Sequence, residues 1–255
     1  MTEDTDVKTA APSEGDEIRQ NGLVKGVPGR RVSINGVLDL RGVPKEEVAR
    51  IESLKINGVV LLDEANQAGL AEVNSRVNGS IVVVDPDLRV IVEPNIEFSR
   101  GSVETMAAGQ KLMLVGNVFF KPDLPAALVA EKFDQLHVVG ILIACEGVLG
   151  ALTGKMEMTG ITISLPDSGG HVVRSMGQNT WDSDYLSRLP DGSIYINVGA
   201  TTIPEDVGVE LVEQKIAAYY NVGMTCAAPA VLSLLRSRCS TNLGDFSPLG
   251  GEEGA

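Results

Sequence analysis

A short apolar segment centred on a glycine recurs along this chain and constrains its fold more than any other feature. One copy reads Val-Ser-Ile-Asn-Gly-Val-Leu-Asp-Leu over 32–40, and the next reads Leu-Lys-Ile-Asn-Gly-Val-Val-Leu-Leu over 54–62. The central glycines of the eight copies are Gly36, Gly58, Gly79, Gly116, Gly140, Gly160, Gly199 and Gly223. A period of roughly 20–25 residues is typical of proteins that stack one structural unit on the next.

A proline or an acidic residue follows six positions after most of these glycines. It is Glu64, Asp85, Pro122, Glu146, Pro166 or Pro229 in six of the eight copies. Proline fits the first position of a helix, and acidic side chains in the first turn complement the helix dipole. Amphipathic spacing follows over 45–53, 124–135, 207–220 and 229–238. The pattern therefore predicts a strand, a turn and a short helix in each unit.

Strands joined by helices should run parallel, so we predict a single-domain α/β solenoid over 29–239 with a parallel sheet and about eight strand-turn-helix units. Its shape resembles that of leucine-rich-repeat proteins, which also have a strand and a helix in each turn. Their Leu-rich strand signature is absent, so the resemblance implies shape alone. The alternative is a set of hairpins, because Asn35, Asn57 and Asn78 directly precede glycines and Asn-Gly favours tight turns.

The glycines themselves have two interpretations. They provide either a positive φ or a close approach between the backbones of stacked units. Successive glycines lie 22, 21, 37, 24, 20, 39 and 24 residues apart. The two long intervals, within 80–115 and 161–195, hold either an extra unit or an inserted loop, and insertions in repeat proteins often lie on the binding face.

The two ends of the chain lack apolar periodicity. We predict disordered acidic tails over 1–28 and 240–255, because such composition buries too little apolar surface to offset the entropy of ordering. The last unit, 222–235, is by contrast strongly apolar. The helix expected from Pro229 either covers the end of the array or leaves that end to contact another subunit.

Charge and composition exclude several classes of partner. The formal net charge is −13, which disfavours binding to nucleic acid and to anionic lipid. No basic and apolar leader begins the sequence, and the apolar stretch over 136–152 is broken by His137 and Glu146, so we expect no membrane insertion. The three cysteines are irregularly spaced, which indicates free thiols and a cytoplasmic location of bacterial type.

Motifs that suggest catalysis each lack a required part. Asp167, Ser168 and His171 crowd one Pro-Asp-Ser-Gly-Gly turn rather than converging across a fold. The segment 147–155 contains Thr-Gly-Lys but no hydroxyl residue after the lysine, as a phosphate loop needs. His137 has apolar neighbours and is expected as an outward-facing strand residue. We therefore predict no catalytic residue and no cofactor.

A metal site is not expected either. Asn179, Asp182 and Asp184 offer oxygen atoms, but the alternation and closing glutamate of a calcium loop are missing. A charged surface loop accounts for them.

Candidate interaction residues come from the long second interval and from the last unit. Trp181, the only tryptophan, and Tyr185 mark either a recognition patch or a packing plug beneath a loop. The other candidate contact residues are Met224, Val231, Leu232 and Leu235.

Three hypotheses for function follow. The first is a non-enzymatic scaffold that binds copies of itself or another protein through the ends of the solenoid. The second is a carbohydrate-active enzyme with carboxylates on successive turns, for which Asp182, Asp184 and Glu205 are the candidates. The third is a regulatory protein-binding module whose tails do the work.

Overall fold

The computed structural model describes residues 18–167 and 170–250. The chain forms a mixed α/β structure in which consecutive strands pair in parallel within three separate sheets. The first sheet holds β1 (Ile18–Lys25), β2 (Arg31–Asp39), β3 (Ser53–Leu62) and β4 (Asn74–Val83). The second sheet holds β5 (Arg89–Phe98), β6 (Gln110–Phe120), β7 (Phe133–Cys145) and β8 (Met156–Leu165). The third sheet holds β9 (Val172–Thr180), β10 (Ser193–Thr202), β11 (Ile216–Ala227), β12 (Cys239–Asn242) and β13 (Asp245–Pro248).

Short helices connect most neighbouring strands of a sheet. They are α1 (Lys45–Val48), α2 (Gln67–Ala71), α3 (Arg100–Glu104), α4 (Ala126–Lys132), α5 (Glu146–Ala151), α6 (Ser183–Arg188), α7 (Val209–Lys215) and α8 (Pro229–Ser237). Glu146 and Pro229 begin their helices as the sequence predicted. Among the described residues, no helix follows Asp85 or Pro166, because the chain crosses there to the next sheet.

The strands bend at the repeated glycines. From Gly36 to Gly223 the eight central glycines have φ between 129° and 149°, which side chains rarely adopt. These glycines pair in register within each sheet, as Gly36, Gly58 and Gly79 do in the first. A Cβ at Gly58 would overlap the carbonyl oxygen of Gly36. Both interpretations of the glycines are therefore confirmed, and each bend divides its strand into a first limb and a second limb.

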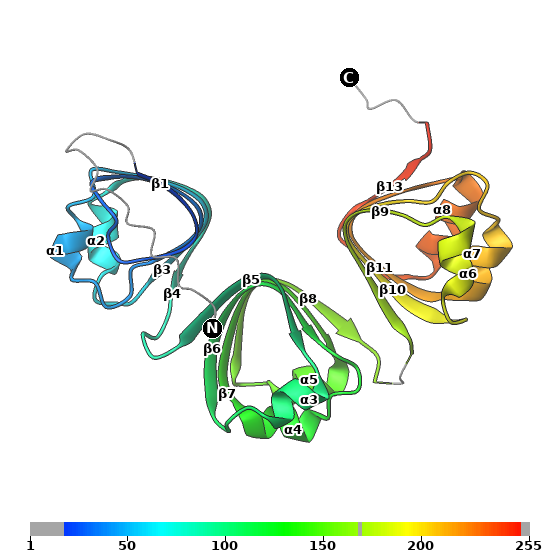
Figure 1. Ribbon diagram of the computed structural model, residues 1–255, viewed down its shortest axis with the longest axis horizontal. Coiled ribbons are helices and arrows are strands. Elements are labelled where there is room, and N and C mark those ends of the chain that lie inside the picture. The colour runs from blue at the N-terminus through cyan, green and yellow to red at the C-terminus, as the bar shows by residue number, and fades with distance from the viewer. Residues whose placement is uncertain (1–17, 168–169, 251–255) are drawn as a thin grey trace, which may run out of the picture.

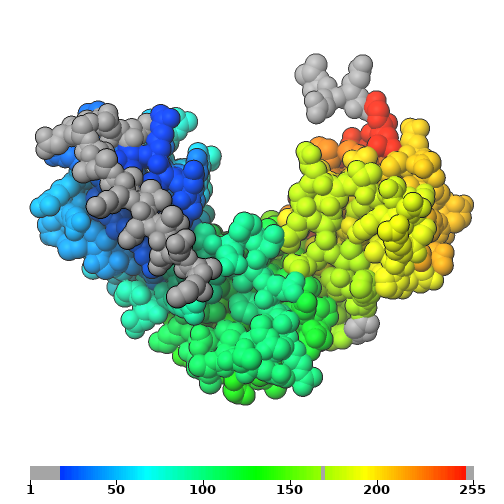
Figure 2. Space-filling view, in the orientation of Figure 1, coloured from blue at the N-terminus to red at the C-terminus, as the bar shows by residue number. Residues whose placement is uncertain are grey.

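Each sheet and its helices enclose a separate core. Ile34, Leu38, Ile56 and Val60 fill the first. The second contains an aromatic cluster in which the ring centroids of Phe98 and Phe120 lie 4.8 Å apart. We call a sheet with its helices a block. Figure 1 shows three blocks along an open arc, with strand bends toward the hollow side and helices on the outer side, and Figure 2 shows the hollow between the first and third blocks.

Apolar residues on the strand faces that point away from each block's own core join the blocks. Second-limb residues of the first sheet, including Val59 and Leu61, pack against Met113 and Val139 from first limbs of the second sheet. The same relation recurs at the next junction, where Ile143 of the second sheet packs in a cluster with Ile196 of the third. Second limbs of one block thus cover first limbs of the next.

Polar contacts reinforce the second junction. Nη2 of Arg174 on β9 lies 2.6 Å from Oε2 of Glu97 on β5. The Arg174 guanidinium also stacks 3.9 Å from the ring centroid of Phe119 on β6. The Cys145 thiol is buried in the same junction, and burial raises its pKa, so it remains a protonated apolar side chain.

The structure departs from the sequence expectations in its number of sheets. Residues 29–239 do not form one continuous sheet, and each long glycine interval contains a complete extra strand, β5 or β9, rather than a loop. Both extra strands begin a new sheet. The rival interpretation of a hairpin series is excluded, because the paired strands of the described residues all run parallel.

The expected tails also differ in their described parts. Ile18–Lys25 forms β1 and pairs with β2, so the segment predicted as disordered to residue 28 contains a strand. Likewise β12 and β13 lie within or beside the predicted 240–255 tail and pair with β11. Residues 1–17 and 251–255 lie outside the described residues. Within the described ranges, no helix has the length and apolar character needed to cross a membrane.

Candidate functional site

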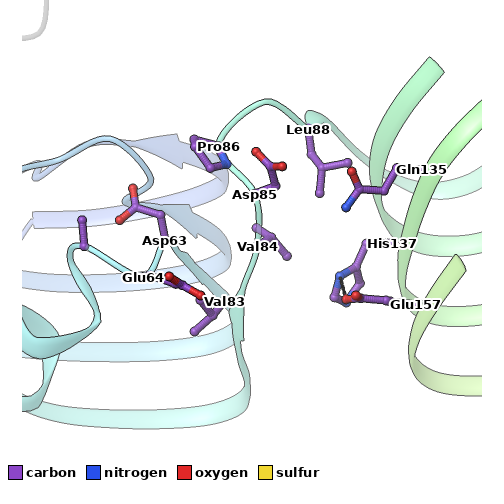
Figure 3. A pocket seen from close by; sticks show the side chains of 11 residues that line it. Asp63, Glu64, Val83, Val84, Asp85, Pro86, Leu88, Gln135, His137 and Glu157 are labelled. Carbon is purple, nitrogen blue, oxygen red and sulfur yellow. Dashed lines mark ion pairs between the residues drawn. The ribbon is translucent and has the colours of Figure 1, made fainter. Parts of the chain in front are cut away.

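A hollow of about 590 Å³ opens where the first and second blocks meet. Figure 3 shows its walls: Asp63, Glu64 and Asp85 line the side formed by the first block, opposite Gln135, His137 and Glu157 of the second. The first-block residues follow β3 and β4, whereas the others lie on β7 and β8. The hollow therefore brings four carboxylates and one histidine to a junction that no single repeat contains.

Backbone hydrogen bonds hold Asp63, one of the polar residues that line the hollow. Asp63 is buried, and its Oδ2 accepts a hydrogen bond from the Gly42 amide at 2.5 Å while its Oδ1 accepts one from the Asn66 amide at 3.0 Å. The Asn66 side chain accepts in return from the Asp63 amide at 3.1 Å and donates to the Leu40 carbonyl. These bonds fix the turns after β2 and β3, so the role of the Asp63 carboxylate is mainly to stabilise these turns.

A partly buried arginine, Arg41, fixes the crossover between the two sheets. Nε and Nη2 of Arg41 pair with the two carboxylate oxygens of Asp39, each at 2.8 Å. Nη1 of the same arginine donates to the carbonyls of Asp85 at 3.1 Å and Leu88 at 2.8 Å. The guanidinium therefore connects the end of β2 to the crossover, and Asp39 raises its pKa.

His137 lies on β7, on the side of the hollow that the second block forms. Its Nδ1 lies 3.2 Å from Oε2 of Glu157, and its Nε2 lies 3.3 Å from the Thr159 hydroxyl. The histidine is only 6% exposed, and burial lowers its pKa more than Glu157 raises it. As the sequence predicted, His137 is an outward-facing strand residue, but the preceding block covers it.

This arrangement lacks the parts of a hydrolytic or metal site. Among the described residues, the two ring nitrogens of His137 meet Glu157 and Thr159 rather than a serine or a cysteine. In 18–167 and 170–250, no group of three or more His, Cys, Asp or Glu side chains is placed to hold a metal ion. The exposed carboxylates of Glu64, Asp85 and Glu157 can attract a cationic group, and the hollow has no further evident chemistry.

The burial of His137 predicts a pH dependence of stability. Because its folded pKa is depressed below 6.5, the unfolded chain gains a proton more readily as the pH falls, so His137 lowers stability increasingly below about pH 6.5. We expect the stability advantage of the wild type over His137→Gln to shrink between about pH 7.5 and pH 5. Urea unfolding at each pH measures this, with His171→Gln at the exposed histidine as control. Parallel pH profiles for wild type and His137→Gln would contradict the expectation.

Most of the proposed interaction residues lie inside the third block. Trp181, Val231, Leu232 and Leu235 belong to its core and are 0–2% exposed. The apolar residues of α8 pack into this core, and β12 and β13 pair with β11 beyond it, whereas contact of this end with another subunit stays a prediction. Only Tyr185 and Met224 remain exposed, at 36% and 47%.

The other sequence candidates have structural roles or no described partner. Asp182 caps α6 by accepting a hydrogen bond from the Tyr185 amide at 2.7 Å, and Asp184 lies in the first turn of that helix. Asn179 donates to the Met176 carbonyl at 3.0 Å, and Glu205 is an exposed turn residue. Thus no contact among the described residues joins the carboxylates of Asp182, Asp184 and Glu205, which the sequence suggested for a carbohydrate-active site.

The residues of the two motifs considered for catalysis make different contacts rather than one shared site. Asp167 accepts hydrogen bonds from the Gly147 amide at 3.0 and 3.1 Å, whereas His171 is exposed, and Ser168 lies outside the described residues. Lys155, which ends the phosphate-loop-like segment, donates to the Ala130 and Phe133 carbonyls at 2.8 and 3.0 Å. Both segments therefore stabilise connections between turns.

Sequence reasoning missed a polar surface on the first sheet. The outward side chains of its first limbs are cationic or carry amide and hydroxyl groups, and Ser33, Lys55, Asn57, Arg76 and Asn78 line a hollow of about 520 Å³ there. The signal was a repeated pattern of a polar or basic residue two positions before Asn-Gly, as in Arg-Gln-Asn-Gly over 19–22 and Lys-Ile-Asn-Gly over 55–58. The first copy was hidden because it lay in the segment taken for a tail.

Comparison of the chain with protein-family models, with curated proteins and with solved structures finds no match.

Proposed function

We propose that this chain is a non-enzymatic scaffold that binds a second copy of itself or another protein by adding a strand to an open sheet end. In this proposal each block is a short solenoid, and the series of three is one solenoid interrupted at two crossovers. The observation that supports it is the edge strand β4 of the first sheet, where Ile81 and Val83 are 51% and 37% exposed.

Ile81 and Val83 occupy positions that are buried one strand earlier. They pair in register with Val60 and Leu62, which lie in the first core at 0% and 1% exposure. β4 is the last strand of its sheet, and among the described residues no helix follows it before β5. The side chains that a further turn would bury are therefore left at the edge.

An edge strand offers backbone donors and acceptors to another chain. β4 pairs on one side with β3 and has no further strand in the described sheet order. Most of its residues are exposed, so a partner strand can reach them. Main-chain pairing supplies affinity and burial of Ile81 and Val83 adds to it, as in other strand-addition interfaces.

Light scattering over a concentration series tests self-association. We expect a mass above the 26.9 kDa of one chain that grows with concentration, and assemblies in negative-stain images. The paired substitution Ile81→Lys and Val83→Lys should weaken association about tenfold or more, because lysines replace the apolar contact and discourage edge pairing. Leu243→Lys is the matched control at an apolar residue that is 54% exposed elsewhere.

The same variants test binding to a different protein. Cross-linking in lysate of the source cells should yield a product with wild type and Leu243→Lys that the paired lysine variant loses. A chain that remains monomeric at every concentration, and whose cross-linked products do not depend on Ile81 and Val83, would overturn the proposal.

A further inference from the structure

Among the described residues, each of the three sheets is four strand levels deep, and β12 and β13 together form the fourth level of the third sheet. The first strands lie at one end of the stack, because Arg174 on β9 pairs with Glu97 on β5. The last strands lie at the other end, because residues after β3 and β4 share a hollow with Glu157 on β8. Figure 1 looks along this stacking direction. We call β1, β5 and β9 the leading end, and β4, β8 and β12 with β13 the trailing end.

The glycine at each bend restricts which strand can be added at the trailing end. A Cβ at Gly36, Gly58 or Gly79 would overlap the carbonyl oxygen of the glycine on the preceding strand. A strand added beyond β4 must therefore carry a glycine opposite Gly79. β1 carries a glycine in this column, Gly22, and a Cβ there would meet no heavy atom within 4 Å in its own chain.

The third sheet ends in the same way. A Cβ at Gly244, between β12 and β13, would overlap the carbonyl oxygen of Gly223, so a further strand there also needs a glycine. β9 carries Gly177 in this column, and its Cβ position is open. Gly22 and Gly177 have φ of 82° and 76°, a range that side chains rarely adopt. In two of the three sheets, the leading end thus has a glycine where the trailing end requires one.

A row of asparagines across the first sheet has complementary ends. Asn35 donates to Asn21 at 3.3 Å, and Asn57 donates to Asn35 at 2.9 Å. Asn78 donates to Asn57 at 3.3 Å, so each amide N–H points toward the preceding strand. The row therefore begins with a donor, Nδ2 of Asn21, and ends with an acceptor, Oδ1 of Asn78. An Asn21 stacked on β4 from a second copy would continue the row.

A polar row inside the third block runs in the opposite direction. Nδ2 of Asn197 donates to Asn221 at 2.9 Å, and Nδ2 of Asn221 donates to Asn242 at 2.9 Å, so the row ends with a donor. Ser175 begins the row in register with Asn197 and is 3% exposed. Its Oγ lies near the Tyr195 hydroxyl but outside hydrogen-bond geometry with any described residue. Asn242 of one copy can donate to Ser175 of the next.

We propose that copies of this chain join head to tail, with the leading end of one copy stacked on the trailing end of another. This joint rests on the proposed strand addition at β4 and names the added strand, which is β1 of a second copy. Val24, Leu38 and Val60 form one column of the first core, and Ile81 is its exposed last member, which Val24 of the second copy would cover. Such a heterologous joint does not close, so it produces filaments. Four levels at about 4.8 Å give an axial repeat of about 19 Å.

Two features weaken the joint. In the second sheet, the bend of β5 holds Glu93 and Pro94 instead of a glycine, and the register shifts there. Pro94 offers no N–H, so pairing of β5 with β8 of another copy is confined to the limbs on either side of the bend. In the first sheet, Arg19 of the second copy would lie beside Arg76, a like-charge contact. We therefore expect assembly that grows with concentration and reverses on dilution.

Light scattering on a mixture of two variants tests the joint. Gly22→Ala with Gly177→Ala blocks the leading end, because each added methyl group would overlap the backbone of the other copy but meets no heavy atom within 4 Å in its own chain. Ile81→Lys with Val83→Lys blocks the trailing end. Alone, each variant should associate about tenfold or more weakly than the wild type. Mixed, they should form a complex of twice the 26.9 kDa of one chain, because each retains the end that the other lacks.

The matched control for the glycine variant is Gly42→Ala with Gly109→Ala. These glycines have φ of 72° and 74° and open Cβ positions, as Gly22 and Gly177 do, but they lie outside the end strands. The control thus introduces the same backbone strain and should assemble as the wild type does. Leu243→Lys should also assemble, because Leu243 lies outside the third core and a lysine there can extend into solvent. Far-UV circular dichroism confirms that each variant folds.

A mixture without the two-chain complex would overturn the head-to-tail joint, and so would a wild-type filament whose axial repeat in electron micrographs differs from about 19 Å. If the glycine variant assembled as the wild type does and only the lysine variant failed, β4 would pair with a different surface, and strand addition would stand without this joint. A wild type that is monomeric at every concentration would also overturn the joint, and the cross-linking experiment would then decide separately whether β4 binds another protein.

Discussion

Replacing Gly58 by alanine is expected to destabilise the chain by about 3 kcal/mol or more, the range of backbone strain combined with a steric clash in a core. Gly58 has a φ of 142°, a conformation that residues with a Cβ rarely adopt. An added methyl group would also overlap the carbonyl oxygen of Gly36, which belongs to the backbone of the neighbouring strand and cannot rotate away. Relief of the clash would require β2 and β3 to separate, which breaks their parallel pairing.

The measurement is urea unfolding followed by far-UV circular dichroism. Gly101→Ala in α3 is the matched control, because its added methyl group would meet no heavy atom within 4 Å and alanine favours a helix by about 0.5–1 kcal/mol over glycine. We expect the control to be neutral or slightly more stable. Equal unfolding midpoints for Gly58→Ala and the wild type would show that the glycine column is not needed for strand stacking.

The repeat made the local fold predictable. The glycine spacing located strands around all eight central glycines, and parallel pairing followed from the helices expected between them. The division into three sheets was not predictable in the same way. Strands such as 54–62 are apolar on both faces of the sheet beyond the glycine, which indicates that both faces are covered. The pattern does not show that a second block covers the face that points away from the core.

The candidate sites were less visible because they depend on contacts between blocks or on register. His137 and Asp63 reach one hollow only because the chain crosses between sheets after β4. The polar surface of the first sheet, by contrast, was encoded at fixed distances from the glycines, and an alignment of units on Asn-Gly would have shown Arg19, Lys55 and Arg76 in one column. Recognition of the strand over 18–25 was the missing step, since its acidic and polar setting masked its glycine.

The buried position of Trp181 shows why an aromatic residue in a long interval was ambiguous. The sequence left a recognition patch and a packing plug as alternatives, and the structure places the indole at 1% exposure in the third core. Its ring centroid lies 3.6 Å from that of Tyr195 and 6.0 Å from that of Tyr219. Among the described residues, its Nε1–H meets no hydrogen-bond acceptor, so its contribution comes from packing.

Trp181→Ala is therefore expected to lower the stability of the chain by about 3–5 kcal/mol, the usual loss when a large buried aromatic side chain is truncated. Trp181→Phe should lose much less, because it retains a ring in the cavity and the removed N–H had no described partner. Since Trp181 is the only tryptophan, unfolding is followed by far-UV circular dichroism rather than by indole fluorescence. Tyr185→Ala, at the exposed neighbour in α6, is the control and should cost far less. If Trp181→Ala were no less stable than Tyr185→Ala, the indole would not support the third core, and a recognition role for the segment 178–188 would again be the better explanation.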